Sequence, residues 1–326
     1  MTLKMFGLGF FAALFGICSV VSAQPVKKLP TIGVLLPDTA LAYASHVDAF
    51  VQGLRQLGYL VDQNIRIEYR YADGKRERFA ELADELARIK VDVILVVGGT
   101  LDAANRATKT IPIVVATAGD LIADGYAASL ARPGGNITGS TNIDSELSAK
   151  RLELFKETLP KVSRVAVISW KGNRQDEDEL KETRAAANTL GLRIQSLALN
   201  DPSQIPDAFA AVADERAQAL IVTNNSFTFG NRRQLFESAE KKRLPTMCGR
   251  DAFAEHGCLM SYAASRLDSF RRAAYFVDKI IKGTKPGDLP IQQPTKFEFI
   301  VNLKTAKQIG LTIPQSILYR ADKVIK

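Results

Sequence analysis

Val91-Asp-Val-Ile-Leu-Val-Val-Gly-Gly-Thr100 is a run of aliphatic residues that stops at a glycine pair and is followed by a helix-forming stretch. Apolar residues in succession, rather than in alternation with polar ones, are typical of a strand buried on both faces. Blocks of the same character occur at residues 31–36, 65–69, 111–115 and 136–140. The amphipathic stretches between them predict helices around 46–57, 76–89 and 101–107, so this half should form a parallel sheet covered by helices on both faces.

The pattern then restarts in the second half of the chain. Apolar blocks recur at residues 165–169, 193–197, 219–223, 245–247 and 258–261, with expected helices near 177–190, 206–216, 232–242 and 251–255. Two consecutive sets in matching order indicate two similar lobes. The predicted fold class is α/β, with two doubly wound parallel-sheet lobes joined by a hinge of several crossings.

The C-terminal tail follows two complete lobes. It contains an expected helix at 267–282, a linker with proline and glycine, and a strand at 296–302. We expect this tail to recross between the lobes, which gives an N-terminal lobe of residues 31–142 plus 263–290 and a C-terminal lobe of residues 143–262 plus 291–326. The hinge segments are then expected near 142–145, 262–265 and 290–294.

The N-terminus has the pattern of a secretory signal peptide over residues 1–23: one lysine, an apolar run and a small-residue end at Val21-Ser22-Ala23. Cys18 lacks the residues that usually precede a lipidated cysteine, so we expect cleavage rather than lipidation or a retained anchor. No later stretch is apolar enough to span a bilayer. The sequence therefore predicts a periplasmic protein that is not inserted in the membrane after cleavage.

The charge and the cysteines narrow the class further. The net charge of +8 is spread over expected helix faces, which favours solvated surface over a nucleic-acid site. Cys248 ends one expected strand and Cys258 begins the next, so opposite ends of parallel neighbours should hold them apart. We expect no disulfide between them, because bridged residues need Cα atoms within about 7 Å.

Residues just after each strand should line a cleft, because ligands of doubly wound sheets bind at the carboxyl ends of the strands. Glycines, hydroxyls, amides and a few charged groups dominate there, which suits a small polar ligand with a carboxylate. The candidate ligand-binding residues are Asp38, Thr39, Gly99, Thr100, Thr117, Gly119, Asp120, Ser140, Trp170, Asn173, Asn224, Asn225, Ser226, Phe227, Arg250 and Asp251.

Several of these residues have an expected role. The hydroxyls of Thr100 and Thr117 could accept the negative end of the ligand, Asp120 or Asp251 could pair with an ammonium group, and Trp170 or Phe227 could cover an apolar side chain. The alternatives are a core position for Trp170 and an acid–base pair among Asp38, Asp120 and Asp251.

The sequence has few of the residue patterns that are typical of enzyme active sites. The two histidines, His46 and His256, have no companion at metal-ligand spacing, and no Cys-x-x-Cys pair occurs. The glycine pair at 98–99 is neither a dinucleotide fingerprint nor a phosphate-binding loop. We therefore expect no catalytic residue, metal or cofactor.

Several stretches together are similar to the ABC-transporter substrate-binding family that includes tryptophan- and tyrosine-binding members. They are Ile32-Gly-Val-Leu35, Phe50-Val-Gln-Gly-Leu-Arg-Gln-Leu-Gly-Tyr59, Ile65-Arg-Ile-Glu-Tyr-Arg70, Gly99-Thr100, Asn136-Ile-Thr-Gly-Ser140, Lys150-Arg-Leu-Glu-Leu-Phe-Lys156 and Leu259-Met-Ser-Tyr262. The resemblance runs from Thr31 to Val324. It implies a type-I periplasmic-binding fold with three crossings, no catalysis, and delivery to a permease and its ATPase. It places ligand contacts at Thr100, at 117–120, at Trp170 and at 224–226.

The expected function is therefore capture of a small solute by a monomer. An amino acid, aromatic ones included, leads the candidates, ahead of a small organic acid or a purine-like solute. A periplasmic two-lobed enzyme and a sensor subunit remain as alternatives, since fold alone does not define function. A lactose-repressor-like regulator would need a helix-turn-helix before the first strand, where this sequence has the signal peptide.

Overall fold

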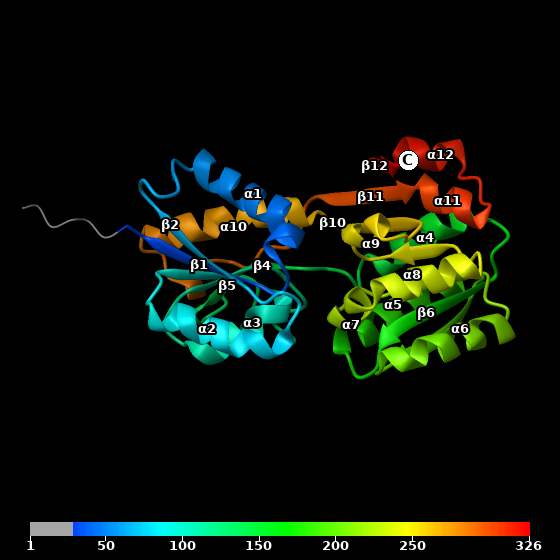
Figure 1. Ribbon diagram of the computed structural model, residues 1–326, viewed down its shortest axis with the longest axis horizontal. Coiled ribbons are helices and arrows are strands. Elements are labelled where there is room, and N and C mark those ends of the chain that lie inside the picture. Colours follow the sequence, from blue (N-terminus) through cyan, green and yellow to red (C-terminus); the bar gives the residue numbers. More distant parts are fainter. Residues whose placement is uncertain (1–28) are drawn as a thin grey trace, which may run out of the picture.

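The computed structural model describes residues 29–326, and the expected signal peptide lies outside them. Two α/β lobes lie side by side along the long axis of the molecule (Figure 1). The first sheet is parallel, and its strands in spatial order are β2 (Arg66–Tyr71), β1 (Thr31–Leu36), β3 (Val93–Val97), β4 (Ile113–Ala118) and β5 (Ile137–Thr141).

Alternate residues of the first sheet face two separate cores. In β3, Val93, Leu95 and Val97 pack with α1 (Ala40–Gln56) and α10 (Arg266–Ile281), whereas Ile94 and Val96 pack with α2 (Phe79–Arg88) and α3 (Gly98–Ala107). All five residues are buried. This double burial explains why the strand reads as one continuous apolar run.

Helix α10 comes from the far end of the chain and packs against α1 in the first lobe. The approach is closest at Gly53, where a Cβ atom would lie 2.4 Å from the carbonyl oxygen of Arg271. Only glycine leaves room for that contact. The docking of α10 brings its first residue, Arg266, to the boundary between the lobes.

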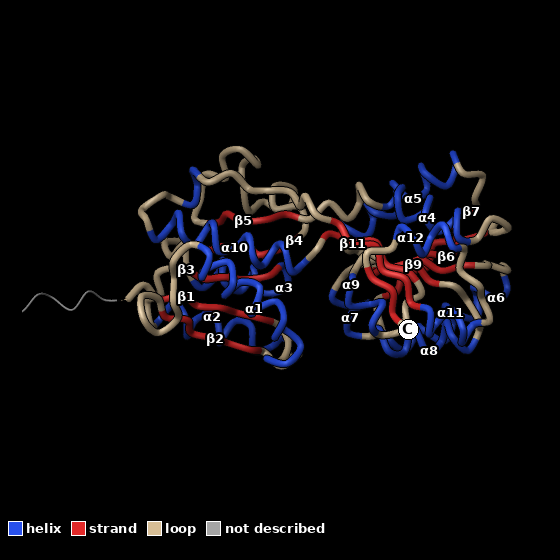
Figure 2. Tube along the Cα trace, turned by 90° about the horizontal axis from the view of Figure 1, so that it is seen from above, coloured by secondary structure: helices blue, strands red, loops and turns tan. Residues whose placement is uncertain are grey.

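The second sheet has seven strands. In spatial order they are β12 (Lys323–Ile325), β11 (Phe297–Asn302), β10 (Met260–Ala264), β9 (Thr246–Cys248), β8 (Ala219–Val222), β6 (Arg164–Trp170) and β7 (Arg193–Leu199). Only the β10–β11 pair is antiparallel among the described strands. Figure 1 shows α1 and α10 on one side of the first sheet and α2 and α3 on the other. From above (Figure 2), the strands of the second lobe run through its middle with helices around them.

The two faces of the second sheet also have separate cores. One core contains α4 (Ser148–Thr158), α5 (Arg174–Thr189), α11 (Leu303–Ile309) and α12 (Gln315–Arg320). The other contains α6 (Ile205–Asp214), α8 (Arg232–Lys241) and α9 (Asp251–Glu255), with the short α7 (Ser226–Gly230) beside it. The predicted fold class is confirmed.

Three segments of the chain pass between the lobes. The first joins β5 to α4, and the second is the single residue Ser265 between β10 and α10. The third precedes β11 and is held to the first lobe where the backbone N–H of Ile291 donates to the carbonyl of Leu130 at 2.8 Å. Between residues 29 and 326, no helix combines the length and apolarity needed to cross a bilayer.

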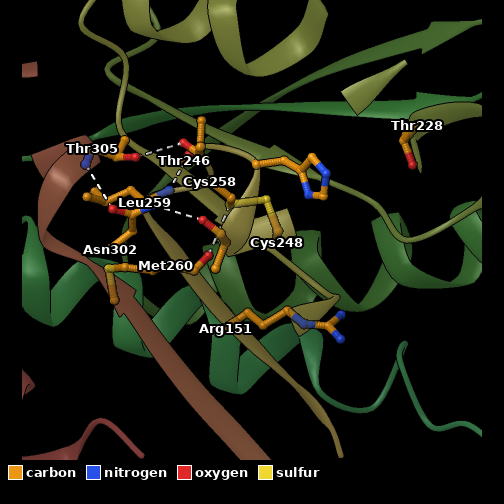
Figure 3. Close-up of a disulfide and its surroundings, with 12 residues drawn as sticks. Arg151, Thr228, Thr246, Cys248, Cys258, Leu259, Met260, Asn302 and Thr305 are labelled. Atoms are coloured by element: carbon orange, nitrogen blue, oxygen red, sulfur yellow. Dashed lines mark hydrogen bonds between the residues drawn. A yellow bond between two sulfur atoms is a disulfide. The ribbon is translucent and has the colours of Figure 1, made fainter. Parts of the chain in front are cut away.

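The expectation of separate cysteines is wrong, because Cys248 and Cys258 form a disulfide with their Cα atoms 6.6 Å apart (Figure 3). Strand β9 has only three residues, so its two ends are close together. Cys258 precedes β10 and lies in the turn after α9, where the N–H of the next residue, Leu259, donates to the hydroxyl of Thr246 at 2.8 Å. Cys258 was expected to begin the next strand, but β10 begins at Met260, so Cys258 lies in the turn before it and comes within reach of Cys248.

Two helices begin earlier than expected. Helix α1 begins at Ala40 because the hydroxyl of Thr39 accepts a hydrogen bond from the N–H of Ala42. Helix α3 begins at Gly98, so the glycine pair and Thr100 form its first turn.

Candidate functional site

A cleft of about 760 Å³ lies between the lobes at the carboxyl ends of both sheets. The first lobe contributes the loops after its strands and one face of α3, and the second contributes the loops after β6, β8 and β9. Nine of the sixteen predicted residues line it: Asp38, Gly99, Thr117, Gly119, Asn173, Asn224, Asn225, Ser226 and Arg250.

Thr100 does not reach the cleft, which corrects its expected role. The side chain is fully buried, and its hydroxyl lies 3.2 Å from the carbonyl oxygen of Leu35 and 3.0 Å from that of Val97. In the first turn of α3 the residue points into the lobe, while Gly99 beside it faces the cleft. The hydroxyl therefore anchors α3 to the end of β1.

Trp170 and Phe227 lie outside the cleft lining and pack on each other, with ring centroids 6.3 Å apart and planes at 19°. From the other lobe, the guanidinium of Arg76 lies 5.8 Å from the Trp170 ring. A second contact between the lobes is the hydrogen bond from Arg174 Nη1 to the carbonyl of Ala123, at 2.6 Å. The aromatic pair thus belongs to a contact between the lobes.

The other four predicted residues have local structural roles. Thr39 caps α1, and Asp120 accepts from the N–H groups of Ile122 and Ala123 beside a smaller cavity of about 150 Å³. Ser140 is buried in β5, and Asp251 accepts from the N–H of Ala252 at the start of α9. None of these four lines the cleft as described for residues 29–326.

The structure adds cleft residues that the sequence analysis missed. They are mostly arginine and aromatic side chains on helices, one or more turns past a strand end. The main ones are Tyr43, Arg76, Phe79, Arg106, Tyr126, Phe229, Arg232 and Arg266. The prediction considered only the loops directly after the strands. Basic and aromatic residues near the start of the following helices were the signal that could have identified these positions.

A buried polar network supports the second-lobe wall of the cleft. The amide of Asn224 donates to Asp144 at 3.1 Å, and the amide of Asn225 donates to Asp176 at 2.6 Å. Asp144 lies in the first crossing and is itself 2.7 Å from Arg151 Nη2. These contacts tie the asparagine loop to the hinge.

Arg151 is the centre of that network and is almost completely buried. Its Nε donates to the carbonyl of Tyr262 at 2.8 Å, and its Nη1 donates to Glu179 at 2.9 Å. The guanidinium packs against Gly249, where a Cβ atom would lie 2.8 Å from Cζ. One guanidinium therefore joins the first crossing to strand β10, helix α5 and the loop that carries Arg250.

The free energy of unfolding is expected to fall as the pH rises from 6.5 to 8.5. Burial raises the pKa of Glu179 to about 8, and the charges of Asp144 and Asp176 add to this while Arg151 opposes it. The unfolded carboxyl ionises near pH 4.5, so in this window the native state binds more protons and the slope is negative. Its limit is about 1.4 kcal/mol per pH unit.

Urea unfolding at several pH values would measure this slope, and Glu179→Gln should flatten it. Burial, with Arg266, also lowers the pKa of His46 to about 4, and this group gives the opposite slope, but only below its unfolded value of 6.5. Burial raises the pKa of Asp176 to about 6, so its titration is largely complete before the window opens. A wild-type stability that rises across the window would contradict the assignment.

Comparison with known proteins gives a consistent picture. A family model described as ABC transporter substrate binding protein matches residues 32–325. A tyrosine-binding protein of Clostridioides difficile (strain R20291) is 23% identical over 288 residues, which cover 87% of this chain and 82% of the relative. The solved structure of an ABC domain from Streptococcus pneumonia, in complex with L-Trp, has a TM-score of 0.81 at 23% identity. It covers 91% of this chain and 100% of that chain. A conserved domain protein from Vibrio cholerae gives the same TM-score, identity and coverage.

Proposed function

The chain belongs to the family of ABC transporter substrate-binding proteins, and on that basis we propose that it captures a small carboxylate-bearing solute in the cleft between its lobes. The observation that carries this proposal is the cleft itself, which both lobes line with polar and aromatic side chains. The named relatives bind tyrosine and L-Trp, which makes an amino acid or a related carboxylate the first class to test.

The remaining parts of the proposal follow from the family. The protein is exported to the periplasm, acts as a monomer without catalysis, and delivers its solute to a permease and its ATPase. Because three crossings join the lobes, we expect them to close on the ligand as a hinge near residues 142–145, 262–265 and 290–294.

Replacing Gly99 with leucine is expected to weaken solute binding by at least about tenfold without loss of stability. Gly99 lines the cleft, and a Cβ atom there would meet nothing within 4 Å, so the new side chain fits the fold and occupies the ligand volume. Gly135→Leu is the matched control, since Gly135 is equally open but lies outside the cleft.

The measurement begins with a thermal-shift screen of amino acids, organic acids, nucleobases and sugars, because a ligand of the folded state raises its stability. Calorimetry on the hit then compares the two variants, and small-angle scattering with and without the hit tests closure. Stabilisation by sugars alone, or equal affinity for Gly99→Leu and Gly135→Leu, would overturn the proposed site.

A further inference from the structure

The cleft has an unbalanced positive charge. Five arginine and three aspartate side chains line it, and one pair, Arg106 with Asp102, is in direct contact. Three of the other arginines form a group that we call the arginine cluster: Arg232, Arg250 and Arg266. Within residues 29–326, none of the three has a carboxylate oxygen within 4.0 Å.

The cluster is built from both sides of the cleft. Arg232 and Arg250 come from the second lobe, and their guanidinium carbons lie 4.2 Å and 3.5 Å from the centroid of the Phe229 ring. Arg266 begins α10, the helix that docks on the first lobe. The Phe229 ring thus holds two of the guanidinium groups in place at the lobe boundary.

Each arginine of the cluster has an unsatisfied donor. The Nε atoms of Arg232, Arg250 and Arg266 are all buried without a hydrogen-bond acceptor among the described residues. A buried N–H without a partner is costly. Three such donors on arginines that line one cleft and have no carboxylate partner indicate that the site is complete only when an acceptor of negative charge is bound.

Neighbouring groups do not supply that negative charge. Burial and the positive charge of Arg266 together lower the pKa of Arg250 to about 10, while Tyr43 and Asp251 oppose the shift. Asp251 and Glu255, both on α9, also oppose the lowering of the His46 pKa. No carboxylate oxygen of either residue lies within 4.0 Å of a nitrogen of the arginine cluster. The local field therefore stays positive and would repel an ammonium group.

We propose that the arginine cluster binds the carboxylate of an organic acid that carries no ammonium group, so that the cleft selects net anionic solutes over zwitterionic amino acids of the same shape. The inference rests on the proposed function and names its substrate class. The aromatic lining supplied by Tyr43, Phe79, Tyr126 and Phe229 accommodates a flat apolar body behind the carboxylate. The relatives named for tyrosine and L-Trp would then differ from this chain in the charge they accept.

Calorimetry on matched pairs of ligands tests this selection. The pairs are indolepropanoate with L-tryptophan and hydroxyphenylpropanoate with L-tyrosine. We expect the member without the ammonium to bind at least about tenfold more tightly in the pair that fits the cleft. If the amino acid binds as tightly or more tightly, the selection is refuted while the proposed function stands. If no member of any pair binds and only sugars do, the proposed function fails as well.

Two variants that remove one positive charge each test whether the arginine cluster causes the preference for the anion. Arg266→Met and Arg250→Met should each weaken binding of the preferred anion by about ten- to a hundredfold and shrink the difference within its pair. Arg233→Met is the control, because Arg233 follows Arg232 on α8 but lies outside the cleft and contacts Glu237, with its side chain 89% exposed. It should change affinity by less than about threefold.

The melting temperature of the unliganded variants separates binding from a structural role. Removing a guanidinium that has no carboxylate partner should leave the unliganded protein as stable as the wild type or more so. Wild-type affinity for the anion in both cluster variants would overturn the proposal, as would equal losses in Arg233→Met. The proposal would also be refuted if the cluster variants lost much of their unliganded stability but still distinguished the paired ligands as the wild type does. That result would mean that the cluster has a structural role.

Discussion

Replacing Arg151 with methionine is expected to lower the free energy of unfolding by about 3–5 kcal/mol. The substitution keeps most of the side-chain volume but leaves the carboxylate of Asp144 buried without its cation, and it removes the hydrogen bonds to Glu179 and to the Tyr262 carbonyl. Breaking a buried ion pair from one side is far more costly than losing an exposed pair. The loss is expected in urea unfolding at pH 7.

Arg233→Met is the matched control, because Arg233 also contacts a glutamate but its side chain is 89% exposed. Its expected effect is within about 0.5 kcal/mol. Because Arg151 holds the first crossing to β10 and α5 of the second lobe, the variant should also change the scattering profile of the unliganded protein. Equal stability losses for Arg151→Met and Arg233→Met would mean that the buried network does not stabilise the hinge.

Removing the disulfide is expected to cost about 3 kcal/mol. The bridge closes a loop with a sequence separation of ten, and cross-linking a loop of that size restricts the unfolded chain by about this amount. The double variant Cys248→Ala with Cys258→Ala suits the test, since both positions are buried in an apolar core and alanine adds no polar group. The same loop carries Arg250, so binding of an anion should weaken in the double variant too.

A reductant provides the internal control for the disulfide. Reduced wild type should lose about as much stability as the double variant, and the double variant should not respond to the reductant. The state of the bridge is checked by mass spectrometry under each condition. A wild type that is fully reduced yet as stable as the oxidised form would show that the bridge does not stabilise this fold.

The sequence by itself predicted the fold class, because burial on both faces makes each strand a continuous apolar block and the helix between two blocks makes them parallel. The family resemblance read from the same stretches is confirmed by the match over residues 32–325. The predicted strand ends also identified Gly99, Thr117 and Asn224 as cleft residues, because the carboxyl ends of parallel strands share one edge of a sheet.

Only the tertiary structure decided which of two adjacent residues faces the cleft and which residues distant in the sequence come into contact. Thr100 points inward and Gly99 outward because α3 begins at Gly98, a boundary that the apolar pattern does not define. Cys258 reaches Cys248 because it lies in the turn before β10 and not in the strand itself. Arg266 reaches the cleft because α10 returns to the first lobe and packs on Gly53. A local sequence pattern reports the burial of each residue, whereas distances between elements depend on how the completed layers pack.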